Sequence, residues 1–271
     1  MPELPEVETT RRGIRAALRG RRVVGFVLRD HRLRWPVSPA LARELPGQRV
    51  RDVGRRAKYL LIELERGTLI AHLGMSGSLR VLPAGTPWLK HDHYELELDS
   101  GRCLRFNDPR RFGSLHWVTG DPLQHPLLAD LGPEPLDAGF DGAYLAARAR
   151  GRKVAVKQYL MDQRIVVGVG NIYASEALFR AGIHPRRAAG KVSRQRFDRL
   201  AAGVKSVLGE AIRQGGTTLR DYVSADGTPG YFRQQLYVYE REGQACRRCG
   251  TPIRKLAQGQ RSTYYCPACQ K

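Results

Sequence analysis

Polar and apolar residues alternate along much of the first half of the chain, and this pattern predicts a β-rich structure. Tyr94, Leu96 and Leu98 alternate with acidic residues, as in a strand with one buried face. Further strands are expected at residues 23–29, 49–54, 58–65, 68–73, 77–82, 102–107 and 112–118. Because these segments follow one another closely, they favour an antiparallel sandwich or barrel over β-α-β units.

Helical periodicity is found at the start of the chain and again in its second half. Residues 5–18 are expected to form a helix, because Pro5 suits a first helical position. The stretch 131–136 contains a glycine and two prolines and indicates a linker. After it, helices are expected at residues 141–149, 153–161, 171–181 and 194–213. Asn171 is expected to cap the third of these helices.

The net charge of the chain indicates that it binds a polyanionic partner. The chain has 271 residues with 46 lysines and arginines against 26 acidic residues, a net charge of +20. Such an excess is typical of proteins that bind nucleic acid, although a compositional drift towards arginine would also produce it. An anionic membrane surface is a further alternative, but we find no basic amphipathic segment that supports it.

The chain shows no signal for a membrane or for secretion. It has no apolar run of about 18 residues. Its start, Met1–Glu6, is acidic and contains prolines, whereas a secretory signal needs a basic start and an apolar stretch. We therefore expect a cytoplasmic protein without a membrane partner.

Four of the five cysteines form a metal-binding pattern at the end of the chain. Two residues separate Cys246 from Cys249 and Cys266 from Cys269, and 16 residues lie between the pairs. This spacing predicts one structural zinc, because four thiolates leave no position for water. Disulfides are the alternative, and they are disfavoured in a cytosolic protein. Cys103 stands alone and is expected to be a small buried apolar residue.

The segment between the two cysteine pairs predicts a basic hairpin. Thr251–Leu256 and Arg261–Tyr265 are expected to pair around Gly259, which places Arg261 near the tip. Residues 246–271 contain six basic side chains and no acidic one. A narrow hairpin of this kind can enter a groove of DNA, or it can be a purely structural clamp.

The N-terminus contains a candidate nucleophile. If Met1 is removed, the imino nitrogen of Pro2 becomes the chain terminus. A terminal amine has a pKa of about 7.7–8.0 against about 10.4 for lysine, so more of it is neutral and nucleophilic at pH 7. Glu3, beside it, is a candidate acid or base. The alternative, which spacing alone favours, is that Glu3, Glu6 and Glu8 serve only the helix start.

Six motifs in one order along the chain together resemble the bacterial formamidopyrimidine-DNA glycosylase family. They are Met1–Thr9, Arg55–Leu60, His72–Gly77, Asp108–Gly113, Gly168–Tyr173 and the four-cysteine finger. The resemblance extends over residues 2–271 and implies an α+β multidomain fold. This fold has an N-terminal antiparallel β-sandwich catalytic domain with a leading helix, a helix-two-turn-helix DNA-binding domain and a zinc finger, with DNA in the cleft between the halves. The corresponding boundaries are 2–130, 131–240 and 241–271.

The resemblance also implies catalytic roles. Pro2 matches the residue that attacks the sugar C1′ and forms a Schiff base, and Glu3 matches the essential acid or base. Lys58 matches a catalytic lysine that meets phosphate near the lesion, although from the residues alone it would be a surface charge. Residues 216–231 match a loop that covers the extruded base.

Seven further residues match DNA contacts of the family. Three match the side chains that fill the space left by the everted base: Met75, Arg110 and Phe112. Asn171 and Arg261 match ligands of the phosphates that flank the damaged nucleotide, and His72 and Tyr239 match further phosphate contacts. Without the resemblance, Met75 and Phe112 would be core residues and Arg110 a solvated strand residue.

The implied function is that of a bifunctional DNA glycosylase and abasic-site lyase of base excision repair. Its substrates would be 8-oxoguanine opposite cytosine and ring-opened formamidopyrimidines in double-stranded DNA, with β,δ-elimination after base removal. Structural zinc would be the only cofactor, and the protein would be a monomer in the bacterial cytoplasm, on the nucleoid when bound to DNA.

Two alternatives stay open. Endonuclease VIII, the sister family, removes oxidised pyrimidines on the same scaffold, although Leu4 and the run Arg110–Phe112 favour the purine enzyme. The other alternative is a non-catalytic, structure-specific DNA binder, which the charge and the finger would fit equally well.

Overall fold

The computed structural model describes residues 2–216 and 235–271 and separates them into two units. The first unit extends to Ala129 and includes residues 214–216, and the second contains Asp130–Arg213 and residues 235–271. Within the described residues, no helix is both long and apolar enough to span a bilayer. The domain boundaries expected from the sequence stay a prediction.

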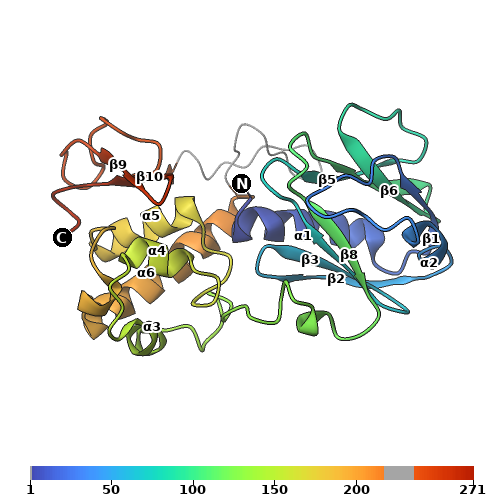
Figure 1. Ribbon diagram of the computed structural model, residues 1–271. Helices are drawn as coiled ribbons and strands as arrows, with labels where there is room; N and C mark the ends of the chain where they lie inside the picture. Colours follow the sequence, from blue (N-terminus) through green and yellow to red (C-terminus); the bar gives the residue numbers. More distant parts are fainter. Residues whose placement is uncertain (1, 217–234) are drawn as a thin grey trace. The chain divides into compact units, whose positions relative to one another are not determined.

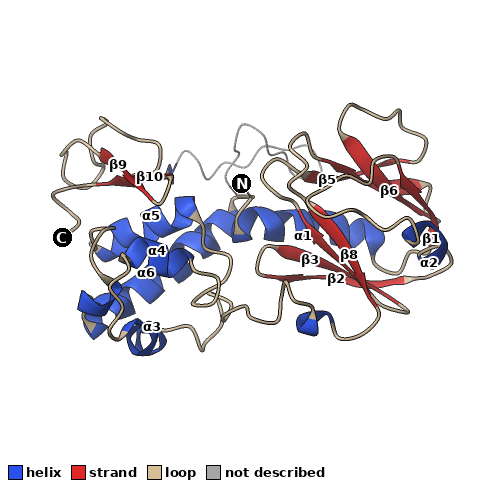
Figure 2. Ribbon diagram, viewed as in Figure 1, coloured by secondary structure: helices blue, strands red, loops and turns tan. Residues whose placement is uncertain are grey.

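Two four-stranded antiparallel sheets form the body of the first unit (Figures 1 and 2). One sheet has the order β1 (Val23–Leu28), β6 (Asp92–Leu98), β7 (Arg102–Asn107), β5 (Ser78–Pro83). The other has the order β2 (Val50–Arg56), β3 (Tyr59–Leu64), β4 (Thr68–His72), β8 (Ser114–Val118). Helix α1 (Leu4–Leu18) packs against β2, β3 and β5, and the short α2 (Leu41–Glu44) against β1. The antiparallel sandwich expected from the alternating pattern is thereby confirmed.

The apolar faces of both sheets and of α1 share one core. Ile14 and Leu18 of α1 are fully buried in it, together with Leu60 of β3 and Leu104 of β7. In β6 the expected alternation is incomplete, because Glu95 is also buried. Its carboxylate pairs with the guanidinium of Arg105, which in turn donates to the carbonyls of Thr86 and Pro87. The outer face of this strand is therefore covered, and the expectation of a half-buried strand was wrong there.

Four α-helices and a hairpin form most of the described part of the second unit. The helices are α3 (Gly142–Ala149), α4 (Val156–Met161), α5 (Asn171–Ala181) and α6 (Arg194–Arg213), and α5 and α3 both pack against α6. Strands β9 (Arg254–Gln258) and β10 (Arg261–Tyr265) form the hairpin, and β10 contacts α5. Gly182 ends α5 in the left-handed region, at φ 67°, as the sequence indicated.

Three local expectations differ from the structure. Asn171 is the first residue of α5 and does not cap it, because Gly170 occupies the N-cap position. The helix expected at 153–161 begins only at Val156, since Ala155 is extended and forms an antiparallel bridge with Ala188. The strand expected at 112–118 begins at Ser114, because the residues before it form a loop.

A cluster of arginines around Glu8 joins helix α1 to the sheet that contains β2. The Glu8 carboxylate accepts hydrogen bonds from Arg11 and Arg12 on the same helix and from Arg55 on β2. Burial alone would raise the pKa of Glu8, but these hydrogen bonds and the arginine charges bring it to about 2. The acid at this position therefore stabilises the helix and its packing on the sheet.

We expect Glu8→Gln to lower the free energy of unfolding at pH 7 by about 2 kcal/mol. Because the folded state lowers this pKa, the stabilisation is complete above pH 4.5 and is lost as the pH falls to about 2. Urea unfolding of both proteins across this range measures the difference. Glu44→Gln, an exposed change on α2, is the control. A difference that stays constant down to pH 2 would contradict the assignment.

Candidate functional site

The chain start is fixed at the N-terminus of α1. Pro2 is buried, and Glu3 is only 3% exposed. Glu3 is the N-cap residue and forms a capping box with Glu6, in which the Glu3 N–H donates to the Glu6 carboxylate over 2.8 Å. Glu6 therefore has a structural role in capping the helix, and Glu8 has a structural role in binding the three arginines. The same contacts hold the backbone of Glu3, and with it Pro2, in one position.

Lys58 lies in the turn between β2 and β3, next to His72 on β4. The preceding residue, Ala57, has φ 56°, and Lys58 itself is only 5% exposed, so it is not the surface charge that its neighbours in sequence suggested. Burial, with the charges of Lys58 and Arg34, lowers the pKa of His72 to about 4. Its Nδ1 accepts the Gly74 N–H over 3.0 Å. His72 is therefore neutral at pH 7, with its Nε2 proton available to donate.

Met75, Arg110 and Phe112 lie on two loops that touch. Met75 is half-buried, whereas Arg110 is exposed and Phe112 is 44% exposed. The Arg110 guanidinium lies over the Phe112 ring, 5.0 Å from its centroid. Gly74 has φ 68°, and a Cβ there would stand 2.5 Å from the Phe112 carbonyl carbon, so only glycine permits this contact between the loops. Phe112 is therefore not a core residue, and Arg110 is not a strand residue.

Asn171 is joined to the β10 strand through a buried lysine. The Nζ of Lys157 donates to the Asn171 side-chain oxygen over 2.6 Å and to the Thr263 hydroxyl over 2.7 Å. The Asn171 amide in turn donates to the Ser262 carbonyl over 3.0 Å. Asn171 and Arg261 line one pocket of about 140 Å³ in this unit. The predicted phosphate ligands of the second unit thus lie together.

Arg261 occupies the hairpin tip that the sequence predicted. It is exposed and pairs with Gln258 across Gly259 and Gln260, whose φ angles are 55° and 59°. Two consecutive residues with positive φ are typical of a two-residue hairpin loop, because the twist of such a loop matches that of the strands it joins.

Tyr239 is held by Glu176 of α5. The Glu176 carboxylate accepts three backbone N–H groups, from Tyr237, Val238 and Tyr239, each over 2.9 Å. Burial raises the pKa of Glu176, and these hydrogen bonds with the charge of Arg180 act against that shift. The Tyr239 hydroxyl lies 3.5 Å from the Asn171 amide, so Tyr239 also belongs to this group.

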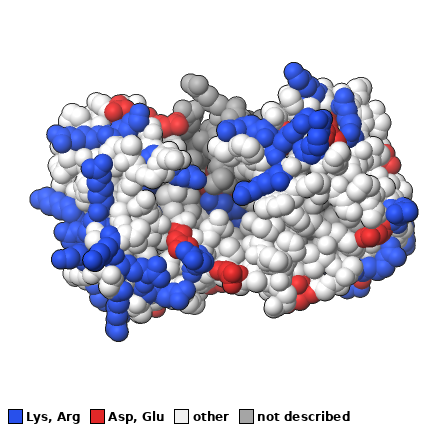
Figure 3. All heavy atoms as spheres, in the orientation of Figure 1, with Lys and Arg blue, Asp and Glu red and all other residues white. Residues whose placement is uncertain are grey.

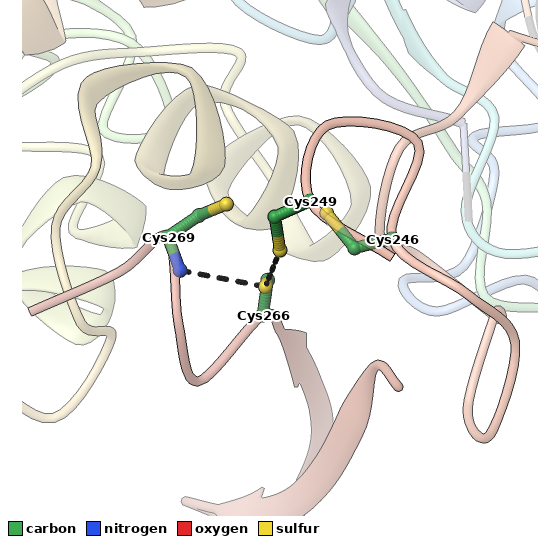
Figure 4. A group of neighbouring side chains, drawn as sticks. All are labelled: Cys246, Cys249, Cys266 and Cys269. Carbon is green, nitrogen blue, oxygen red and sulfur yellow. Dashed lines mark hydrogen bonds between the residues drawn. The ribbon is translucent and has the colours of Figure 1, made fainter. Parts of the chain in front are cut away.

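The four cysteines converge on one point (Figure 4). Their sulfur atoms all lie within 4.8 Å of one another, and Cys249 and Cys266 are 3.5 Å apart, too far for a disulfide. A tetrahedral zinc with Zn–S bonds of about 2.3 Å requires sulfurs about 3.8 Å apart, so the donor set fits. Cys246 and Cys266 also accept backbone N–H groups at sulfur, which suits thiolates. Cys103 of the first unit is fully buried, as expected.

Sequence reasoning missed the buried charges that hold these groups. Lys157 and Glu176 are each at most 2% exposed, and Asp108 is fully buried. The available signal was a charged residue inside a helical run of small and apolar residues, as in Ala174–Phe179. The loop at 216–231, expected to cover an extruded base, lies outside the described residues apart from Gly216.

On the face that Figure 3 shows, lysine and arginine side chains are spread over both units. The three parts of the chain match three known families. Residues 1–115 match the formamidopyrimidine-DNA glycosylase N-terminal domain, and residues 131–223 match the formamidopyrimidine-DNA glycosylase H2TH domain. Residues 243–271 match the zinc finger found in FPG and IleRS, so the four-cysteine site is a site for one structural zinc.

Individual relatives match over their whole length. The formamidopyrimidine-DNA glycosylase of Stenotrophomonas maltophilia (strain K279a) is 60% identical over 271 residues, which is all of both chains. A Lactococcus lactis FPG mutant in complex with Fapy-dG DNA has a TM-score of 0.93 at 33% identity, with all of both chains covered. MutM (FPG) from Thermus thermophilus has a TM-score of 0.88 at 42% identity and covers 99% of this chain and 98% of its own. The chain therefore belongs to the formamidopyrimidine-DNA glycosylase family.

Proposed function

We propose that this protein is a bifunctional DNA glycosylase and abasic-site lyase that removes oxidised purines from duplex DNA in base excision repair. The observation that carries the proposal is the chain start, where Pro2 and Glu3 are buried and fixed at the N-terminus of α1. The full-length match to formamidopyrimidine-DNA glycosylases, one of them in complex with Fapy-dG DNA, supports the substrate class. The cytoplasm, on the bacterial nucleoid, is the proposed place of action.

The proposed chemistry needs a neutral amine at Pro2. The positive end of the α1 dipole disfavours a cation at the chain start, which favours the uncharged, nucleophilic form. The Pro2 nitrogen bonds to C1′ of the sugar as the bond from C1′ to the damaged base breaks, and the base leaves with the proton that the nitrogen loses. Glu3 protonates the opening sugar ring, and the resulting Schiff base permits β,δ-elimination.

The proposed DNA contacts divide between the two units. In the first unit, Lys58 and the neutral His72 meet phosphate near the lesion. The three exposed or half-buried side chains Met75, Arg110 and Phe112 fill the space left by the everted base, which otherwise costs a few kcal/mol of lost stacking. In the second unit, phosphate is bound by Asn171, Tyr239 and Arg261.

Zinc has a structural role in this proposal. The four cysteines hold the ends of the β9–β10 hairpin in place and thereby fix the position of Arg261. Four thiolate ligands leave no open coordination position, so all chemistry falls to side chains and to the terminal amine.

Borohydride trapping tests the nucleophile. Two preparations of the same chain are compared, one that begins at a free Pro2 and one whose Pro2 nitrogen is acetylated. We expect the first preparation to form a covalent adduct with an 8-oxoguanine duplex. The yield of adduct from the second should be lower by more than about a thousandfold. Binding to damaged DNA should be similar in both, which excludes misfolding. Equal trapping would exclude Pro2, and no trapping by either would favour the non-catalytic DNA binder.

The same assay separates the sister families. Duplexes that contain 8-oxoguanine opposite cytosine or thymine glycol opposite adenine are offered to the Pro2 form. We expect the higher excision rate on 8-oxoguanine. A wide preference for thymine glycol would assign the protein to the pyrimidine-excising activity of endonuclease VIII.

Arg261→Ala tests the finger as a DNA contact. Loss of one charge-assisted phosphate contact is expected to weaken binding by about tenfold to a hundredfold and to reduce the slope of log K against log salt by about one. Arg254→Ala, an exposed arginine at the other end of the same hairpin, is the matched control. If both variants weaken binding equally, a general charge effect explains the result better than a specific contact.

Zinc removal is expected to abolish strand cleavage. Because the metal stabilises the finger, a strong chelator should unfold residues 246–271 and release Arg261 from its position. Zinc content, near-ultraviolet circular dichroism and cleavage are measured on one sample before and after the metal is returned. Full cleavage by a protein shown to be free of zinc would contradict the structural role.

A further inference from the structure

Asp108 follows β7 and is fully buried between two loops. Its Oδ1 accepts the hydroxyl of Ser76 over 2.7 Å and the backbone N–H of Arg110 over 3.2 Å. Its Oδ2 accepts the backbone N–H of Gly113 over 2.8 Å. One carboxylate therefore holds the loop at 109–113 near both of its ends and also contacts the loop at 73–77.

The loop at 109–113 has a defined outward face because of these bonds. Between the two anchored amides, Arg111 adopts φ 58° and its guanidinium pairs with Asp30 over 2.8 Å. The middle of the loop is thus tied to the segment after β1, while Arg110 and Phe112 are exposed, with the Arg110 guanidinium over the Phe112 ring. A non-glycine residue at positive φ costs about 1 kcal/mol or more, so surrounding contacts must hold it.

The second loop is aligned with the first through Ser76. Ser76 directly follows Met75, and both Ser76 and Asp108 are buried. The loop is closed by a bond from the Gly77 N–H to the Leu73 carbonyl, 2.9 Å long. His93 adds a further fixed point, because its Nε2 lies 2.7 Å from the Asp108 carbonyl oxygen.

We propose that Asp108 is a positioning residue that sets Met75 on one loop and Arg110 and Phe112 on the other into a single arrangement, with Ser76 as the link between the loops. The inference rests on the proposed function and deepens it. The three side chains then enter the DNA stack as one preformed group, so that little ordering is left to occur when the base turns out. A hydrogen bond to a buried carboxylate is among the stronger ones, which suits this task.

Two kinds of DNA substrate should respond differently when this positioning is lost. When the damaged base of a duplex turns out, it leaves a space opposite the partner base that must be filled. A single-stranded abasic site has no partner strand and so has no such space. Loss of the Ser76 link should therefore impair reaction with the duplex and spare Schiff-base formation with the single strand. A generally damaged fold would impair both equally.

Ser76→Ala is the test variant and Ser114→Ala its matched control. Ser114 is also buried, lies at the start of β8, and its hydroxyl has no hydrogen-bond partner among the described residues. For each protein, single-turnover excision of 8-oxoguanine opposite cytosine is compared with borohydride trapping on a single-stranded abasic oligonucleotide. Asp108→Asn, which turns one acceptor into a donor, is the second variant. Thermal unfolding is measured for all of them.

We expect Ser76→Ala to slow excision in the duplex on the order of tenfold, with trapping on the single strand unchanged and Ser114→Ala like the unsubstituted protein. Asp108→Asn is expected to give the same split with a larger loss. Unchanged duplex excision in Ser76→Ala, or an equal loss on both substrates, would overturn the inference. Failure of the proposed function would show separately, as no trapped adduct from the unsubstituted protein, and would overturn the inference with it.

Discussion

A chain terminus can serve as a nucleophile only if it is held, because the first residues of a chain are ordinarily its most mobile part. Here Pro2 directly precedes a helix whose first turn is closed by the capping box of Glu3 and Glu6. That helix is joined to the sheet by the arginine cluster around Glu8. The acidic residues at the chain start thus combine two roles that the sequence left as alternatives, since Glu6 and Glu8 provide the rigidity that the proposed chemistry at Pro2 and Glu3 requires.

Buried charges organise the predicted DNA contacts in both units. Asp108 orders the loops of the first unit, and Lys157 and Glu176 order Asn171 and Tyr239 in the second. Each is almost inaccessible to water and has several hydrogen-bond partners, so the cost of removing its charge from water is offset by directional contacts. Removing one partner would leave an unsatisfied charge, and this makes such networks sensitive supports for side chains that bind DNA.

The sequence predicted those features of the fold and of the site that depend on residues close together in the chain. Strand periodicity predicted the sandwich, and the cysteine spacing predicted the zinc site. The hairpin expected around Gly259 placed Arg261 at its tip, although the first strand is Arg254–Gln258 and not Thr251–Leu256. Contacts across long stretches of sequence were out of reach. The bridge between Ala155 and Ala188 delays the start of α4. Gly170 occupies the N-cap position of α5, and the Asn171 side chain instead accepts a hydrogen bond from Lys157. The burial of Glu95 depends on Arg105 in the neighbouring strand, which no periodicity reveals.

Peptide mapping of the covalent adduct tests the central claim most directly. After borohydride reduction on an 8-oxoguanine duplex and digestion of the DNA, trypsin should release the N-terminal peptide of residues 2–11. The account predicts that this peptide begins at Pro2, lacks Met1 and carries the sugar remnant on the proline nitrogen. An adduct on Lys58, or an active protein that still carries Met1, would contradict it.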